Sequence, residues 1–261
     1  MTPDWLRRAR AAADAPPAQP RVPLLFGAEA APVGSVEPGL GERLAAAGLL
    51  LRHADAAWWL AEPGDEALAA IARWLHAEGI CARWRDELLS VRDASGRRLG
   101  AIERAAVRAL AIATEAVHLD VAASQGGTWV QLRARSKATD PGLWDTTMGG
   151  QVGHGESIED ALRRETLEEA GLDAASLRAL RRRDDILVRR PVAEGYMVER
   201  IVVFGARLGA DAEPVNRDGE VERFERLDVA SLRDRLAAGG FTLEATLILG
   251  RRLEEETGGA R

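Results

Sequence analysis

Short apolar runs separated by glycine and proline predict a β-rich first part of the chain. The strand-like runs cover residues 22–26, 33–36, 49–60, 80–91 and 99–103. Between them, apolar residues recur at i, i+3, i+4 and i+7 from Leu68 to Leu75, which predicts an amphipathic helix over residues 65–78 that Gly79 ends. We therefore expect a small α+β domain over residues 21–112.

Longer β-rich runs follow from about Thr114 and predict a second domain over residues 113–261. The runs cover residues 115–122, 128–135, 197–208 and 221–227, and two helices are predicted over residues 231–238 and 243–255. Residues 1–20 are poor in bulky apolar side chains and end in a proline-rich stretch, so they are expected to form a flexible leader.

The composition is that of a globular protein. The chain has 261 residues, of which 46% are hydrophobic and 29% charged, and its formal net charge of -6 argues against a nucleic-acid partner. Its apolar stretch at residues 44–51 contains Gly48 and is too short to span a bilayer, which argues against a membrane protein. A single cysteine, Cys81, cannot form an intramolecular disulfide, so a reducing cytoplasmic location is expected.

Residues 149–172 combine a glycine-rich loop with an acidic helix. Ser157 followed by Asp160 is a capping-box pattern that starts the helix, and Gly171 stands where a left-handed cap would end it. At about 100° per residue, the carboxylates of the last turns continue the face that the apolar residues of the first turns direct at the protein. These carboxylates are Glu165, Glu168 and Glu169. An ordinary solvated charged face would not follow the apolar stripe in this way.

Such a cluster calls for a cation. Glu165 and Glu169 form an i, i+4 pair of like charges, which is unfavourable on a bare helix. Hard oxygen ligands without histidine or thiolate select Mg²⁺, with Mn²⁺ as the alternative, and such an ion binds phosphate oxygens well. Arg164 can reach neighbouring carboxylates, including Glu156, and so hold the loop and the helix together.

The spacing in this segment resembles the Nudix box, G-x5-E-x7-R-E-U-x-E-E-x-G-U. The matching residues are Gly150, Glu156, Arg164, Glu165, Glu168, Glu169, Gly171 and Leu172. The match departs at Thr166, where a bulky aliphatic residue is usual. The resemblance implies an α+β fold, namely a Nudix α/β/α sandwich with a mixed sheet, here preceded by the small α+β domain.

The resemblance also implies roles for individual residues. Glu165, Glu168 and Glu169 would be catalytic and would bind Mg²⁺ together with the backbone carbonyl of Gly149. The glycines and the charged pair of the motif would be structural, namely Gly150, Glu156, Arg164 and Gly171.

Three further segments are similar to a branch related to the Nudix part of fungal thiamine-pyrophosphokinase-related proteins, which carries an uncharacterised N-terminal domain. They are residues 84–88 with 102–106, residues 129–133 with 137–145, and the acidic loop 214–224. Asp140 departs from this branch, which often has an aromatic residue there.

The implied activity is hydrolysis of a diphosphate linkage in a small X-linked diphosphate, with thiamine diphosphate or an analogue among the candidates. Glu165 is the first candidate for the base, and Glu220 and Glu222 are candidates for a further metal ligand or for the base. An exposed turn beside Gly219 is the alternative interpretation of Glu220 and Glu222.

Three residues are candidates for substrate binding, and each has a structural alternative. Lys137 could contact a phosphate or be solvated, and Trp144 could stack on a heteroaromatic ring or fill the core. His154, within the glycine-rich loop, could contact a phosphate or face solvent.

Two alternative functions are weighed against hydrolysis. Isopentenyl diphosphate isomerase shares the implied fold, but Met148 stands where its catalytic cysteine would be. A non-catalytic Nudix ligand sensor could dispense with the metal-binding glutamates, and all three are present here. The sequence leaves the oligomeric state open.

Overall fold

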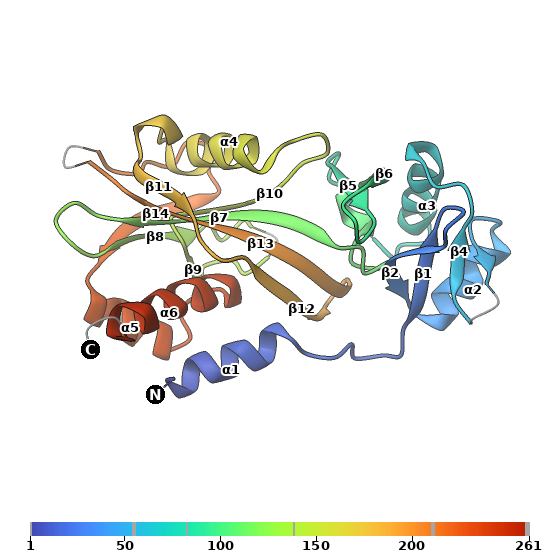
Figure 1. Ribbon diagram of the computed structural model, residues 1–261, viewed down its shortest axis with the longest axis horizontal. Helices are drawn as coiled ribbons and strands as arrows, with labels where there is room; N and C mark the ends of the chain where they lie inside the picture. Colours follow the sequence, from blue (N-terminus) through green and yellow to red (C-terminus); the bar gives the residue numbers. More distant parts are fainter. Residues whose placement is uncertain (1, 54–55, 82, 138, 210–211, 259–261) are drawn as a thin grey trace.

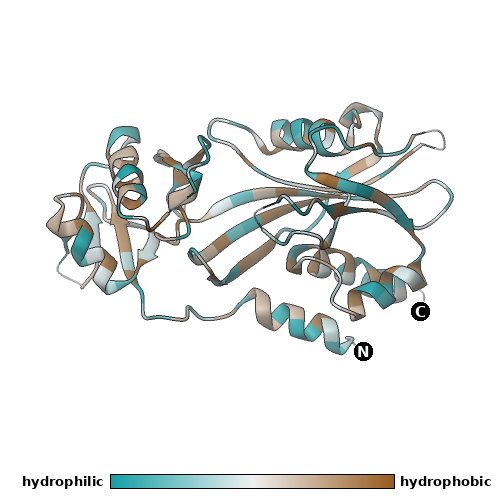
Figure 2. Ribbon diagram, turned by 180° about the vertical axis from the view of Figure 1, so that it is seen from behind, coloured by the Kyte–Doolittle hydropathy of each residue, from teal (hydrophilic) through white to brown (hydrophobic). Residues whose placement is uncertain are grey.

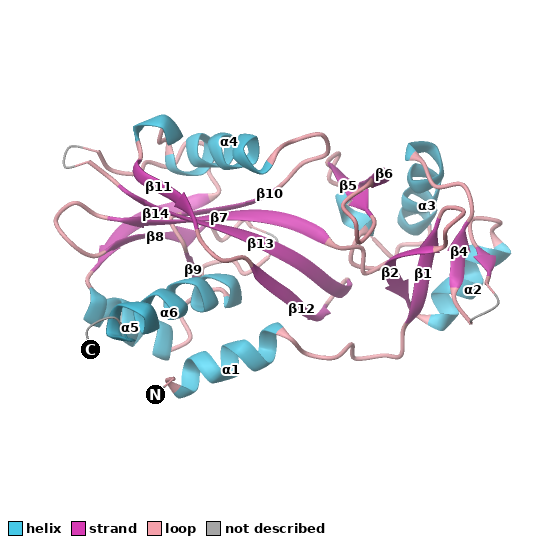
Figure 3. Ribbon diagram, viewed as in Figure 1, coloured by secondary structure: helices cyan, strands magenta, loops and turns pink. Residues whose placement is uncertain are grey.

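The computed structural model describes residues 2–53, 56–81, 83–137, 139–209 and 212–258. They form a large sandwich and a smaller N-terminal unit, connected by extended chain (Figures 1 and 3). None of the helices in these ranges combines the length and the apolar character that crossing a lipid bilayer requires.

A mixed sheet forms the middle layer of the sandwich. Its strands are β7 (Thr114–Ala122), β8 (Thr128–Arg133), β9 (Trp144–Asp145), β10 (Met148–Gln151), β11 (Arg178–Arg182), β12 (Ile186–Val192), β13 (Gly195–Arg207) and β14 (Val221–Leu227). The main order is β11-β13-β7-β8-β14, with β10 added on β7, β12 on β13 and β9 on β8. Strands β7 and β13 run parallel, and the other pairs are antiparallel.

Helices cover both faces of this sheet (Figure 1). Helix α4 (Ile158–Ala170) lies on one face, and α5 (Val229–Ala237) and α6 (Leu243–Gly258) lie on the other. Hydrophobic stretches follow the strands of the sheet, while the helices alternate hydrophobic and hydrophilic positions (Figure 2). The alternation arises because each helix has one face on the sheet and one in solvent. The predicted α/β/α sandwich with a mixed sheet is confirmed.

The N-terminal unit has its own core. A four-stranded sheet of order β2-β1-β4-β3 and a separate hairpin β5–β6 surround it together with two helices. The elements are β1 (Val22–Phe26), β2 (Ala31–Val36), α2 (Pro38–Ala46), β3 (Leu51–Arg52), β4 (Trp58–Leu60), α3 (Asp65–Ala77), β5 (Leu88–Arg92) and β6 (Arg98–Glu103). Helix α3 buries the predicted apolar stripe, including Leu68 and Leu75.

Two strand predictions for this unit were wrong in extent. In place of one strand over residues 49–60, residues 51–52 and 58–60 form two short antiparallel strands, and His53 N–H donates to the carbonyl of Ala57 between them. Of the predicted strand 80–91, the described residues 80–81 and 83–87 are not a strand. The backbone N–H groups of Arg85 and Glu87 donate to the carboxylate of Glu103 instead of to a neighbouring strand.

The expectation of a flexible leader was wrong for residues 4–13. They form helix α1 (Asp4–Ala13), which packs against α6 and β12. The reason is a short apolar stripe of Leu6, Ala9 and Ala13, all of which are buried. Gly250 of α6 allows the close approach, since a Cβ there would lie 2.8 Å from Leu6 Cδ1.

Candidate functional site

A cleft of about 580 Å³ lies between the sandwich and the N-terminal unit. The glutamates of α4, namely Glu165, Glu168 and Glu169, line it together with Gly149 and Gly150 of β10. The facing wall comes from the N-terminal unit, namely from Cys81, Arg83, Arg85, Glu87, Leu89, Arg104, Ala105, Val107 and Arg108. The acidic helix face identified in the sequence therefore borders a cavity of small-molecule size.

Local capping fixes where α4 begins and ends. Ser157 Oγ accepts a hydrogen bond from the N–H of Asp160 at 3.1 Å, as the capping-box pattern predicts. Gly171 ends the helix with a φ of 63°, in the left-handed region, and its N–H donates to the carbonyl of Leu167. Because the two caps fix the ends of α4, they also fix where the three glutamates lie along it.

Gly150 makes room for the carboxylate of Glu165. A Cβ at position 150 would come within 2.5 Å of Glu165 Cγ and would overlap its carboxyl group. The neighbouring Gly149 packs against the ring of His118, and a Cβ at position 149 would lie 2.6 Å from His118 Cε1. Strand β10 can therefore pass close to the acidic end of α4 because it has no side chain at position 150, and close to His118 of β7 because it has none at position 149.

Arg164 connects the loop and the helix. Its guanidinium donates to both oxygens of Glu156, at 2.6 and 2.8 Å, and to the carbonyl of Gln151 at 3.1 Å. It also donates to Glu165 at 2.7 Å and to Glu168 at 3.2 Å. The hydrogen bond from Arg164 holds the pKa of Glu156 below its usual value. Through these contacts Glu156 and Arg164 join the loop before α4 to the helix.

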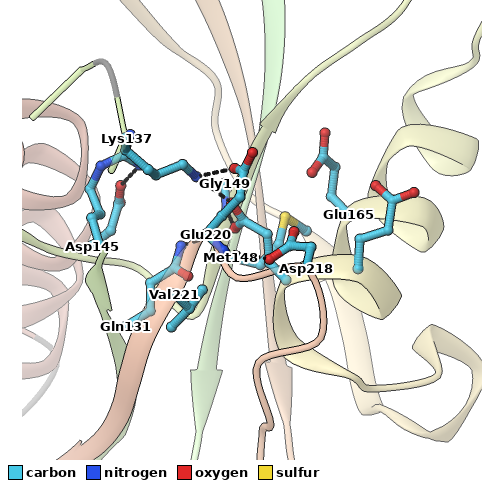
Figure 4. Close-up of polar contacts among 12 residues, drawn as sticks. Gln131, Lys137, Asp145, Met148, Gly149, Glu165, Asp218, Glu220 and Val221 are labelled. Carbon is cyan, nitrogen blue, oxygen red and sulfur yellow. Dashed lines mark hydrogen bonds and ion pairs between the residues drawn. The ribbon is translucent and has the colours of Figure 1, made fainter. Parts of the chain in front are cut away.

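Glu169 is buried and surrounded by donors. Its side chain accepts hydrogen bonds from Gln131 Nε2 at 3.0 Å, from the N–H of Gly149 at 3.1 Å and from Lys137 Nζ at 2.8 Å. Lys137 also lies 2.5 Å from Glu220 Oε2, so its ammonium lies between two carboxylates (Figure 4). Burial lowers the pKa of Lys137, but the charge of Glu169 and the hydrogen bonds to Glu169 and Glu220 outweigh burial and raise it.

Glu165 lies in a less compensated environment. Its side chain is 14% exposed, and burial raises its pKa to about 7, with Arg164 opposing and the charges of Glu169 and Glu168 adding to the rise. In Figure 4 it projects from α4, apart from the Lys137 cluster. An additional positive charge beside this carboxyl group would favour its ionised form.

The predicted convergence of the three glutamates on one point is not seen. Within the described ranges, no three His, Cys, Asp or Glu side chains are gathered closely enough to hold a metal ion. Arg164 and Lys137 hold these carboxylates instead. The donor set nevertheless suits a hard divalent cation, because the ligands are all oxygens and a side-chain cation already lies between Glu169 and Glu220.

Three other candidates have neighbours outside the cleft. Glu222 is exposed and pairs with Arg223, and Trp144 lies beneath Arg223 and Arg235 as part of a hydrophobic cluster. The Nδ1 atom of His154 lies 3.1 Å from Ser90 Oγ. None of these three candidates is among the described residues that line the cleft, whereas Lys137 and Glu220 are. For Trp144 this agrees with the core-filling alternative.

Several residues of the site were not found from the sequence. Gln131 is fully buried and donates to Glu169, and Glu199 accepts from Arg108 at 2.7 Å. Buried Glu244 lines the cleft beside Arg190. Gln131 could have been found, because a polar glutamine at an inward position of a predicted strand indicates a buried hydrogen-bond partner. The other contacts join segments far apart in sequence, and no local pattern predicts them.

Comparison with known proteins places the larger unit in a family. The family model described as NUDIX domain matches residues 113–247, about half of the chain. Nudix hydrolase 20, chloroplastic, of Arabidopsis thaliana is 30% identical over 190 residues, which are 66% of this chain and 48% of that protein. The chain thus spans about half the length of this curated relative.

Two further proteins are similar. Isopentenyl-diphosphate Delta-isomerase of Corynebacterium glutamicum is 32% identical over 172 residues, which are 62% of this chain and 87% of that protein. The solved structure of DR0079 from Deinococcus radiodurans has a TM-score of 0.52 and 27% identity, and covers 64% of this chain and 99% of that one. With the motif on α4 and the sandwich around it, these matches show that the chain belongs to the Nudix family.

Proposed function

We propose that the protein is a Mg²⁺-dependent hydrolase that cleaves the diphosphate linkage of a small X-linked diphosphate. The observation that carries this proposal is the acidic end of α4, which lines a cavity of about 580 Å³ and where the ammonium of Lys137 lies between Glu169 of the helix and Glu220, which precedes β14. A wall that attracts positive charge in this way suits a divalent ion bound to phosphate oxygens.

The proposed ligands of the ion are Glu165, Glu168 and Glu169, with the carbonyl of Gly149 and with Glu220 in preference to Glu222. When bound, the ion supplies charge neutralisation at the diphosphate and lowers the pKa of a coordinated water. Glu165 borders the cleft and would take the proton from the attacking water. Lys137 would exchange one of its two carboxylate contacts for a phosphate oxygen.

The proposed substrate class includes thiamine diphosphate and its analogues. Its support is the sequence similarity of residues 129–133, 137–145 and 214–224 to the thiamine-pyrophosphokinase-related branch. The cleft has the volume for a ligand of that size.

The test measures phosphate and monophosphate release from a panel of vitamin and nucleotide diphosphates, with Mg²⁺, with Mn²⁺ and with EDTA. Glu168→Gln should lower kcat by about 100-fold or more, since removing one charged ligand weakens the ion's hold on the transition state. Glu159→Gln is the matched control, because Glu159 is an exposed carboxylate of the same helix outside the described cleft lining. Equal rates for native protein and Glu168→Gln would overturn the assignment.

Isomerisation of isopentenyl diphosphate is the second candidate, favoured by the similarity to the Corynebacterium isomerase. Met148 argues against it, because it is fully buried and its thioether neither gives nor takes a proton. Incubation with isopentenyl diphosphate separates the two candidates: a hydrolase releases phosphate, whereas an isomerase yields dimethylallyl diphosphate without release.

A further inference from the structure

The two walls of the cleft carry opposite charge. Among the described lining residues, the sandwich contributes ten carboxylates against four lysine or arginine side chains. The N-terminal unit contributes four arginines against one carboxylate, namely Arg83, Arg85, Arg104 and Arg108 against Glu87. A ligand in this cavity therefore faces negative charge on one side and positive charge on the other.

Two of the four arginines are already paired. Arg104 Nη1 lies 2.7 Å from Glu87 Oε2, and Arg108 Nη2 lies 2.7 Å from Glu199 Oε1. Arg83 and Arg85 are exposed, and their side chains make no ion pair or hydrogen bond with the described part of the chain. They are the cations of this wall that are available to a ligand.

The segment that carries these two arginines is fixed by a buried carboxylate. Glu103 is 3% exposed, and its carboxylate accepts hydrogen bonds from the N–H groups of Arg85 at 2.9 Å, Glu87 at 3.2 Å and Ala105 at 3.2 Å. These bonds take the place of strand pairing in residues 83–87. The backbone at Arg85 is therefore held in place, and Arg83 lies two residues before it.

The same unit is attached to the loop that leads into α4. The N–H of His154 donates to the carbonyl of Leu88 at 2.8 Å, and the ring of His154 contacts Ser90. His154 lies between β10 and α4, so this contact sets the arginine wall relative to the acidic helix. Figure 1 shows the hairpin β5–β6 beside this loop.

We propose that Arg83 and Arg85 form a phosphate-binding arm, through which the N-terminal unit completes the active site of the sandwich. The arm would bind the phosphate oxygens of the substrate that face away from α4, so that the diphosphate lies between the acidic wall and the arginines. Arginine suits this task because its planar guanidinium donates two parallel hydrogen bonds to a phosphate. The inference rests on the proposed function for the identity of the substrate class.

The experiment uses the full chain and methylenediphosphonate, a diphosphate analogue that resists hydrolysis, with Mg²⁺ present. Isothermal titration calorimetry should show a Kd at least about 10-fold weaker for the double variant Arg83→Ala, Arg85→Ala, because two charge-assisted contacts are lost. Lysine at both positions should restore part of the affinity. Arg73→Ala is the matched control, since Arg73 is an exposed arginine of α3 outside the described cleft lining.

Kinetics on the best diphosphate of the panel should show KM raised by about 10-fold or more in the double alanine variant, with kcat within about threefold of native. Unchanged Kd and KM in a double alanine variant with native melting temperature would refute the phosphate-binding role of Arg83 and Arg85. Failure of the native protein to bind methylenediphosphonate at millimolar concentration would refute it as well. If the native protein hydrolyses no diphosphate, the proposed function fails, and the Kd comparison still decides whether the two arginines bind phosphate.

Discussion

Gly150→Ala tests how closely β10 and α4 must approach for activity. The added Cβ would lie 2.5 Å from Glu165 Cγ, whereas non-bonded carbons approach to about 3.5–4.0 Å. Glu165 would therefore have to retreat by about 1 Å or more. Its carboxylate is held by Arg164 at 2.7 Å, so the shift would also strain the Arg164 contacts.

A misplacement of about 1 Å in a catalytic group can lower the rate by about 100-fold, which is the expected loss of kcat for Gly150→Ala. Overpacking of this kind should cost about 1–3 kcal/mol of unfolding free energy. The assay measures phosphate release under saturating substrate and Mg²⁺, together with urea unfolding. Gly39→Ala in α2 is the control, because nothing lies within 4 Å of a Cβ there. A folded Gly150→Ala protein with native kcat would refute the reasoning.

Three further outcomes concern stability. Glu199→Ala should lower the free energy of unfolding, measured in urea, by about 3–5 kcal/mol, because Arg108 loses its buried counter-charge; a loss below about 1 kcal/mol would contradict this. Burial raises the pKa of Glu199, but the charge of Arg108 and the hydrogen bonds outweigh burial and hold it below the ordinary 4.5. The stability that this carboxylate adds is therefore complete above about pH 4.5 and lost as the pH falls through its folded pKa, so the melting temperature of native protein should fall more steeply in acid than that of Glu199→Gln. Leu6→Ala should cost about 2–5 kcal/mol by calorimetry, because Leu6 is fully buried under α6; an unchanged melting temperature would mean that residues 4–13 behave as a flexible leader after all.

The local features of α4 could be predicted from the sequence because neighbouring residues create them. Ser157 caps the helix through a group three residues away, and Gly171 ends it through its own backbone freedom. The same holds for the strands β7, β8, β13 and β14, whose apolar runs are long enough to indicate their ends within one or two residues.

The cleft itself was decided by tertiary packing. Lys137 meets Glu169 across 32 residues of sequence, and no periodicity predicts which cation will reach which carboxylate. The same reason explains why Trp144 and His154, predicted to bind substrate, do not line the cleft. It also explains why α1 was not predicted: its apolar stripe is short and becomes buried only against Gly250 of α6, which is distant in sequence.

The sequence by itself thus determined the acidic helix, since its caps and its carboxylate face follow from spacings within a single element, and the resemblance of that segment to the Nudix box implied the sandwich. Which groups surround that helix, including the arginine wall of the N-terminal unit, was decided by how separate elements pack, because contacts between distant segments depend on the whole fold and leave no local pattern.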